Sequence, residues 1–219
     1  MDLAFMAEHV PMYWEAAKLT LSLAFWGILF SLILGFACAL VQYYQVRGLR
    51  RVVAVYVELS RNTPLLIQLF FLYYGLTRVG WKLSATACAV IGLTFLGGSY
   101  MAEAIRGGLE AVHKGQIESG LSIGLKKGQL LRYVILPQAL TVAFPALGAN
   151  IIFLIKETSM FSAVALADLM FVAKDLIGMY YKTNEALLML VVAYLIILLP
   201  LSLLMSYLER RMRYAGFGD

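Results

Sequence analysis

Four long stretches of this chain contain no charged residue, and they restrict what it can fold into more than any other feature. They cover residues 19–41, 83–102, 133–155 and 186–208. A helix rises about 1.5 Å per residue, so about twenty residues cross a hydrocarbon core of about 30 Å. Each stretch is therefore long enough to span a membrane as a helix.

A fifth and weaker apolar stretch covers residues 62–77. It is long enough to span only if its helix begins near Val55 and carries Glu58 and Arg61 into the membrane. Pro64 should loosen this helix, because proline lacks a backbone donor and restricts the residue before it. We therefore expect a second span that contains a break and two charges.

The composition favours membrane helices over the buried helices of a large soluble protein. Only 14% of residues are charged and mean hydropathy is +0.80, whereas soluble domains carry about 25% charged residues. Acidic residues precede the first stretch, which is therefore not expected to be a cleaved signal. Cys38 and Cys88 lie in different spans and should pack as small apolar residues. A metal site is not expected, because the chain has only two cysteines and two histidines. We predict an all-α membrane protein with about five transmembrane helices.

The positions of lysine and arginine predict the orientation, because short basic loops stay in the cytoplasm. With the N-terminus outside, the basic segments around residues 45–51, 106–132 and 209–211 all fall on the inner side. The C-terminus then lies inside, and the net charge of +5 needs no nucleic acid to explain it. On the outer side, residues 161–181 place apolar side chains at helical spacing, which predicts a short helix at the surface.

Between the third and fourth spans, the chain becomes polar, basic and rich in glycine over residues 110–139. Residues 115–123 contain enough helix formers for about two turns. Two rows recur every fourth residue, one apolar and one of glycines: Ile117, Leu121 and Leu125, and Gly120, Gly124 and Gly128. Small residues at this spacing let another backbone approach closely. The pattern favours a helix that docks on a partner protein over a basic loop that only sets topology. Leu136 and Pro137 should then end this segment and begin the fourth span.

These residues resemble a known family. Glu118-Ser119-Gly120, then Gly124, then Val134-x-Leu136-Pro137 is similar to the EAA loop of ABC importer permeases, and the spacing matches without a gap. Ser119 and Gly120 replace the two alanines of the family pattern. Further motifs resemble the polar amino-acid branch of the family (histidine, glutamate, glutamine, arginine and opine uptake), with Asn62 where that branch has glycine: Arg61-Asn62-Thr63-Pro64-Leu65-Leu66 with Gln68, Tyr100-x-Ala102-Glu103-x-x-Arg106-x-Gly108, and Lys156-Glu157-Thr158-Ser159.

The resemblance implies that residues 1–219 form a single ABC importer transmembrane domain, with a coupling loop at about 107–139. It implies a multi-pass protein of the bacterial cytoplasmic (inner) membrane and four kinds of partner: a dimer of ABC ATPase subunits, a second permease subunit that is identical or homologous, an extracytoplasmic solute-binding protein, and the amino acid. ATP and Mg²⁺ would be bound by the ATPase, because this chain lacks the Gly-Lys dipeptide that a P-loop requires. The chain itself is not expected to be an enzyme. The residues implied in ATPase coupling are Gly115, Glu118, Ser119, Gly120, Gly124, Leu136 and Pro137.

Charged residues in spans are candidates for function, because each costs about 2.5 to 3.5 kcal/mol at the centre of a membrane on insertion scales. Glu58 and Arg61 lie three residues apart, as do Glu103 and Arg106. Such pairs can neutralise each other on one helix face. Because they are expected near the inner ends of their spans, we favour gating or structural ion pairs over contact with substrate.

Glu157 is expected at the outer end of the fourth span, beside the hydroxyl of Ser159. There a carboxylate could attract a substrate ammonium group, or it could form a solvated turn with Lys156. Thr63 and Gln68 flank the proline break, a kind of place where transporters bind substrates. The third span contains Gly98 and Ser99, which could open its backbone to a substrate carboxylate or could serve helix packing. These six residues are the candidates for substrate binding: Glu157, Ser159, Thr63, Gln68, Gly98 and Ser99.

Two other classes of function are less well supported. A self-sufficient secondary transporter or channel would have no use for the docking pattern, and the chain shows no internal repeat. An intramembrane enzyme would need paired carboxylates, a Ser/His pair or metal ligands within the spans, and the sequence offers none.

Overall fold

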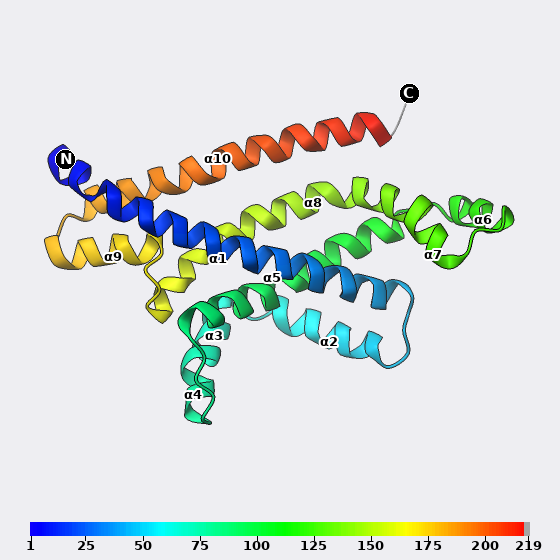
Figure 1. Cartoon of the computed structure of the whole chain (residues 1–219), viewed down its shortest axis with the longest axis horizontal. Coiled ribbons are helices and arrows are strands. Elements are labelled where there is room, and N and C mark those ends of the chain that lie inside the picture. The colour runs from blue at the N-terminus through cyan, green and yellow to red at the C-terminus, as the bar shows by residue number, and fades with distance from the viewer. Residues whose placement is uncertain (217–219) are drawn as a thin grey trace.

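The computed structural model describes residues 1–216, and the regular elements of that range are helices without a single strand. Four segments of the described chain are long and apolar enough to cross a membrane: α1 (Leu3–Tyr43), α5 (Ala85–Glu110), Lys127–Val164 around α8 (Leu136–Glu157), and α10 (Thr183–Gly216). They run along the long axis of the molecule (Figure 1). The predicted all-α membrane class is confirmed, while the number of crossings and the orientation stay predictions.

Helices α1, α5 and α8 pack closely because small residues line their contacts. A Cβ atom on Gly35 would lie 2.5 Å from the Cβ atom of Met101 and 2.8 Å from the backbone nitrogen of Ala102. A Cβ atom on Gly108 would collide with the backbone oxygen of Ala139. Backbone atoms cannot give way as the end of a side chain can, so glycine is required at these crossings.

Both cysteines are buried and free, as expected of small packing residues. Cys88 lies on α5, and Cys38 lies on α1 in a cluster with Val53, Val57 and Ala102. This cluster holds the next helix, α2 (Leu49–Arg61), against the α1–α5 pair.

The predicted break at Pro64 is confirmed, but the segment is not one span from Val55 to Thr77. Helix α2 begins earlier and ends at Arg61, and the chain resumes as an arm of three short elements that leaves the bundle (Figure 1): α3 (Leu65–Phe70), η1 (Phe71–Gly75) and α4 (Leu76–Arg78). The amide of Gln68 stabilises the break, because Nε2 donates to the carbonyl oxygens of Ser60 (3.2 Å) and Thr63 (3.1 Å), which lie at the interruption.

The helix predicted in the polar segment is also confirmed, as α6 (Lys114–Ser122), while its cytoplasmic location stays a prediction. It lies at the far end of the molecule from the N-terminus (Figure 1). Leu136 and Pro137 begin α8, as expected, but they do not separate it from the segment before it. α7 (Lys127–Leu130) runs through η2 (Leu131–Ile135) into α8 without leaving helical geometry.

Proline is tolerated inside this helix because η2 is a wider turn of the π type. Pro137 has no N–H group for the carbonyl four residues before it. A π turn relaxes the regular hydrogen-bond pattern at that point, and the side chain of Gln138 donates to the carbonyl oxygen of Val134 (2.9 Å). The fourth long segment therefore starts in the polar region, ten residues before Pro137, at Lys127.

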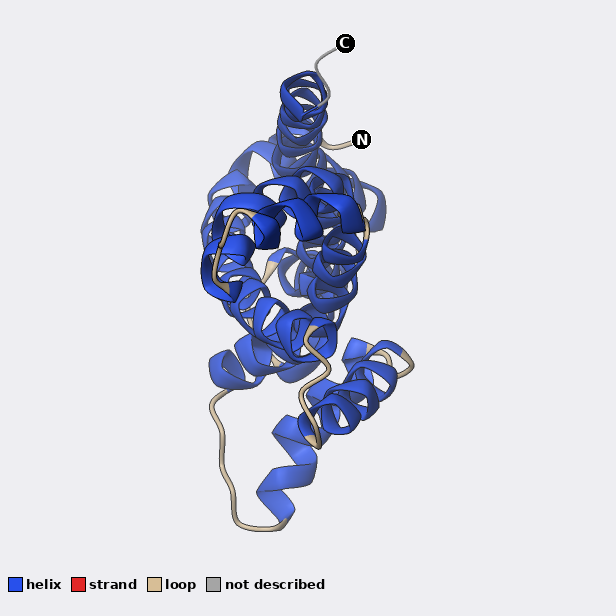
Figure 2. Ribbon diagram, turned by 90° about the vertical axis from the view of Figure 1, so that its right-hand side faces the viewer, coloured by secondary structure: helices blue, strands red, loops and turns tan. Residues whose placement is uncertain are grey.

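The short helix expected between residues 161 and 181 forms, preceded by η3 (Thr158–Val164), as α9 (Leu169–Tyr180). One face of this helix packs against the bundle. Its side chains Leu169, Ala173 and Leu176 are fully buried in a cluster with residues of α1 and α10, such as Tyr13 and Ala186. Seen along the long axis, the helices gather in one bundle, from which a helical segment projects (Figure 2).

Candidate functional site

A cavity of about 590 Å³ lies where the break between α2 and α3 meets the C-terminal end of α8. Its polar and charged side chains come from the interrupted segment and from Glu157. The aromatic rings of Tyr100 and Phe153 form another part of its wall, with their centroids 5.2 Å apart. The lining residues are Arg61, Asn62, Thr63, Pro64, Leu65, Leu66, Leu96, Tyr100, Phe153, Glu157 and Met160.

This cavity lies near the middle of the long helices rather than at either end. The hydroxyl of Ser60, the residue before Arg61, donates to the carbonyl oxygen of Phe95 (2.8 Å) and to Ser99 Oγ (3.0 Å). These two residues stand near the midpoint of α5. The end of α2 is therefore held halfway along α5. The expectation that Arg61 lies near the inner end of its span is wrong.

Glu157 is the last residue of α8, as the sequence indicated, but that helix end is not at an outer surface. Leu154, one turn earlier, packs against Gly97 in the middle of α5. Gly97 in turn faces Ser31, in the centre of the uncharged stretch of α1. Two charged residues that are distant in the sequence, Arg61 and Glu157, therefore line one cavity at the middle of the span.

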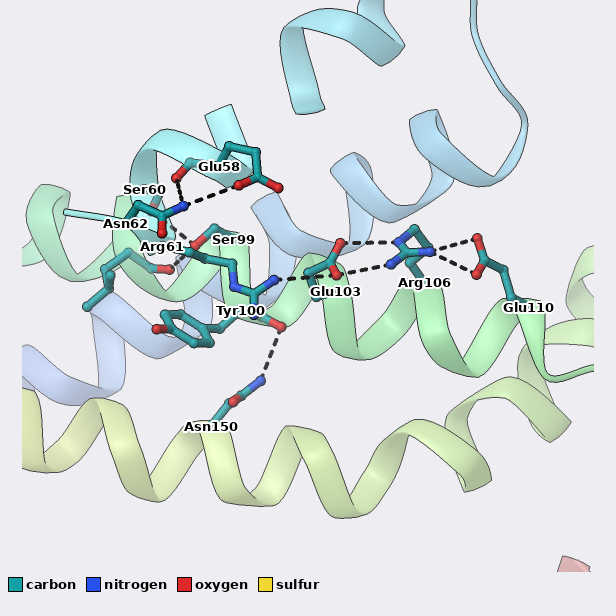
Figure 3. Close-up of polar contacts among 11 residues, drawn as sticks. Glu58, Ser60, Arg61, Asn62, Ser99, Tyr100, Glu103, Arg106, Glu110 and Asn150 are labelled. Atoms are coloured by element: carbon teal, nitrogen blue, oxygen red, sulfur yellow. Dashed lines mark hydrogen bonds and ion pairs between the residues drawn. The ribbon is translucent and has the colours of Figure 1, made fainter. Parts of the chain in front are cut away.

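Arg61 forms its ion pair with a different residue from the one expected. Its Nη1 lies 3.5 Å from Oε2 of Glu103 on α5, and its guanidinium lies 5.3 Å from the ring centroid of Tyr100 (Figure 3). Glu58, the predicted partner, instead accepts a hydrogen bond from Asn62 Nδ2 (3.2 Å). Because Arg61 ends its helix next to α5, its side chain reaches across to the neighbouring helix and not back along its own.

Glu103 belongs to a row of charges that follows α5 (Figure 3). The predicted pair with Arg106 forms with two contacts, Nε to Oε1 (3.2 Å) and Nη2 to Oε2 (3.0 Å). The other side of the Arg106 guanidinium contacts both oxygens of Glu110 at 2.9 and 2.8 Å. Sequence reasoning missed Glu110, although its spacing of four residues from Arg106 is a known signal for a helix ion pair. The row leads from the cavity to the end of α5, three residues before α6 begins.

The other candidates for substrate binding do not all reach the cavity. Thr63 lines it, and its hydroxyl donates to the carbonyl oxygen of Leu59. Gln68 stabilises the break and lines a separate apolar hollow of about 380 Å³. Ser159 lies just beyond Glu157 in η3 without contributing to the cavity wall.

Gly98 and Ser99 are buried behind that wall. A Cβ atom on Gly98 would lie 2.6 Å from the hydroxyl oxygen of Tyr56, and Ser99 Oγ donates to the carbonyl oxygen of Leu96 (2.6 Å). Their positions agree with the packing alternative. Neither residue lines the cavity.

The residues predicted for partner docking gather around α6, at the end of the molecule far from the N-terminus, here called the tip; Glu118 and Ser119 are exposed there. The glycines do not form one row, because each has a different role. Gly120 is buried, and a Cβ atom on it would lie 2.5 Å from Leu130 of α7. Gly124 has a φ of +83° and ends α6, since the amide of Leu125 donates to the carbonyl oxygen of Gly120 (3.1 Å).

Gly128 lies on the next helix, where nothing is within 4 Å of a Cβ atom. The four-residue spacing therefore does not describe a single face. Gly115 lies in the first turn of α6, while Leu136 and Pro137 lie on α8, beyond the π turn. The residues that α6 and its end expose include Glu118, Ser119, Leu121 and Ile123, the last two being 50% and 78% exposed.

The chain is similar to known membrane transport proteins. Residues 12–214 match the family described as binding-protein-dependent transport system inner membrane component. The chain is 35% identical over 217 residues to the probable amino-acid ABC transporter permease protein PatM of Vibrio harveyi, covering 98% of this chain and 97% of that protein. It is 34% identical over 206 residues to the glutamine transport system permease protein GlnP of Escherichia coli K12, covering 93% and 94%.

The fold is also similar to that of a solved structure. A crystal structure of an amino acid ABC transporter with histidines superposes with a TM-score of 0.89 at 33% sequence identity. The match covers 96% of this chain and 99% of the other. The similarity therefore extends over nearly the whole chain.

Proposed function

The chain belongs to the family of binding-protein-dependent transport system inner membrane components, and on this basis we propose that it is the permease subunit of an ABC importer for a polar amino acid. It is a multi-pass protein of the bacterial inner membrane. Its relatives are permease components of ABC importers for amino acids. As a member of a transporter family, the chain is a component of a transport machine and not a catalytic enzyme.

The cavity at the middle of the span is the observation that supports this function. Polar and charged groups in a membrane interior are costly, and transporters place them where a helix is broken and a solute binds. Here Arg61 and Glu157 carry opposite charges at the break of α2 and the end of α8. A free amino acid is a zwitterion that presents both complementary charges. The carboxylate of Glu157 is suited to an ammonium group because it makes no hydrogen bond or ion pair with the residues that the structure describes.

The energy for import comes from a separate dimer of ABC ATPase subunits, which binds ATP and Mg²⁺. Helix α6 is the part that docks on it. Two hydrophobic side chains, Leu121 and Ile123, stand exposed beside Glu118 at the tip, and a helix this short needs a packing partner to be stable. A second permease subunit, identical or homologous, completes the membrane part, and an extracytoplasmic binding protein delivers the solute.

The experiment is uptake by the assembled complex in lipid vesicles, with each of the twenty amino acids offered in turn. We expect ATP-dependent accumulation of at least one polar amino acid, and none when the ATPase or the binding protein is left out. Glutamine is the first to try, because it appears in the names of relatives. Accumulation by the permease alone, driven by an ion gradient without ATP, would contradict the proposal and favour a secondary transporter.

A further inference from the structure

The guanidinium of Arg61 has few partners for a charged group with so many donors. It has five N–H donors, yet it donates no hydrogen bond to any residue that the structure describes. Its contacts are the 3.5 Å approach to Glu103 and the face of the Tyr100 ring. A guanidinium in the middle of a membrane span is expensive unless acceptors surround it. The acceptors are therefore expected to come from outside the chain.

Glu103 is not a full partner for Arg61, because it is already held by Arg106. Both carboxylate oxygens of Glu103 accept from Arg106, at 3.2 and 3.0 Å. The contact with Arg61 is longer than either and uses one oxygen that Arg106 also uses. Glu103 therefore balances the charge of Arg61 without occupying the planar pair of donors that a guanidinium offers.

From this geometry we propose that Arg61 binds the α-carboxylate of the transported amino acid, and that Glu103 is the counter-ion of Arg61 before the amino acid binds. This inference rests on the proposed function. A carboxylate matches the guanidinium fork with two parallel hydrogen bonds, which a neutral amide or hydroxyl cannot do with equal strength. The ammonium group of the same ligand is then directed to Glu157, which lines the same cavity.

Binding of the ligand changes the partners of Glu103. When the ligand carboxylate takes Arg61, Glu103 is left to Arg106 alone, whose other side contacts Glu110 at the end of α5. The charges still balance, because one carboxylate has replaced another at Arg61. The exchange therefore needs no proton transfer, and Glu103 competes with the ligand for Arg61.

Because Glu103 and the ligand compete for Arg61, substitutions of Arg61 and of Glu103 should change the Kd of the ligand in opposite directions. The complex of permease and ATPase is placed in lipid nanodiscs without the binding protein, so that only the membrane part selects the ligand. The probe is the radiolabelled amino acid that the wild-type complex accumulates most strongly, and its Kd is measured by scintillation proximity. The α-carboxamide of the same amino acid serves as the unlabelled competitor that lacks a carboxylate.

Arg61→Gln should raise the Kd of the free amino acid by about 10- to 100-fold, the range for a hydrogen bond to a charged group. The affinity for the carboxamide should stay nearly the same, so the preference for the acid disappears. Arg61→Lys keeps the charge but loses the paired N–H donors of the guanidinium, so its Kd for the free amino acid should lie between those of the wild type and of Arg61→Gln. Arg78→Gln, the same change at the end of α4 and far from the cavity, is the matched control and should bind as wild type does.

Glu103→Gln should lower the Kd by about 2- to 5-fold, because it removes a competitor for Arg61. A merely structural role for Glu103 predicts weaker binding instead, so this variant also decides the matter if Arg61→Gln does not fold. Folding is checked by gel filtration and by recovery of the ATPase with the permease. The inference is overturned if Arg61→Gln still prefers acid over carboxamide, or if a folded Glu103→Gln binds less tightly. Absence of uptake of all twenty amino acids by the wild-type complex is a different result, because it contradicts the proposed function itself.

Discussion

Two regions of the molecule are rich in glycine, and they use it for opposite reasons. Where α5 crosses α1 and α8, the missing side chains of Gly35, Gly97 and Gly108 let backbones of the same chain approach. At the tip around α6, Gly124 and Gly128 have nothing within 4 Å of a Cβ atom. A glycine repeat in a sequence is therefore not evidence for one kind of contact. Each position has to be assigned to packing, to backbone conformation or to a partner.

Substitution of adjacent glycines in α5 should show the largest effect. Gly108→Leu should lower the free energy of unfolding by about 3 kcal/mol or more, because its Cβ atom meets the backbone of Ala139 and cannot be accommodated by a side-chain movement. Gly107→Leu is the matched control: nothing lies within 4 Å there, and leucine favours a helix more than glycine by up to about 1 kcal/mol. Thermal unfolding of the purified protein in detergent measures both. Equal losses in the two variants would show that the crossing is not as close as described.

Reversing a charge at the tip should affect assembly and leave folding unchanged. Glu118→Lys should weaken binding of the ATPase by about 30-fold or more, because the charge on the docking face is inverted. The unfolding temperature should not change, because Glu118 is exposed. Glu8→Lys makes the same change on α1, near the opposite end of the molecule, and serves as the control. Unchanged recovery of ATPase and unchanged uptake in Glu118→Lys would remove α6 from the docking surface.

The smallest effects separate conformation from docking within the tip. Gly124→Ala should destabilise the α6–α7 turn by about 1 kcal/mol, because alanine disfavours a φ of +83°. Gly128→Ala lies in a helix and in open space, so it should stabilise the turn slightly. Hydrogen exchange of amides 114–130 in the isolated permease reports the difference. If both variants then also bind the ATPase normally, neither glycine is needed for close approach of the partner.

Much of the fold could be predicted because hydrophobic patterning is a local signal. The uncharged stretches mark the four long segments, and Pro64 marks the break, since the missing N–H group of proline acts within one turn. The tip helix followed from its helix formers and spacing. Pro137 was expected to end the polar segment, but a π turn continues the helix from α7 into α8, and the sequence shows no pattern that indicates such a turn.

The site was less predictable, because its residues meet through tertiary packing. Spacing along one helix suggested Glu58 for Arg61, but the pairing with Glu103 depends on how α2 lies on α5. Apolar stretches also do not say how deep a helix end lies. Glu157 was correctly placed at the end of its helix and wrongly placed at an outer surface, because the level of that end is set by the contacts of Leu154 and Gly97. Arg61, Thr63 and Glu157 were each singled out in the sequence, but their meeting in one cavity was not predicted.

The helical run from Lys127 to Glu157 has a mechanical consequence. One helical rod, about 45 Å long at 1.5 Å per residue, starts beside α6 and ends with the carboxylate of Glu157 in the cavity. The close contact of Ala139 with Gly108 holds this rod against α5 nearer to its α7 end. A force applied beside α6 is therefore transmitted to Glu157 through one continuous helix.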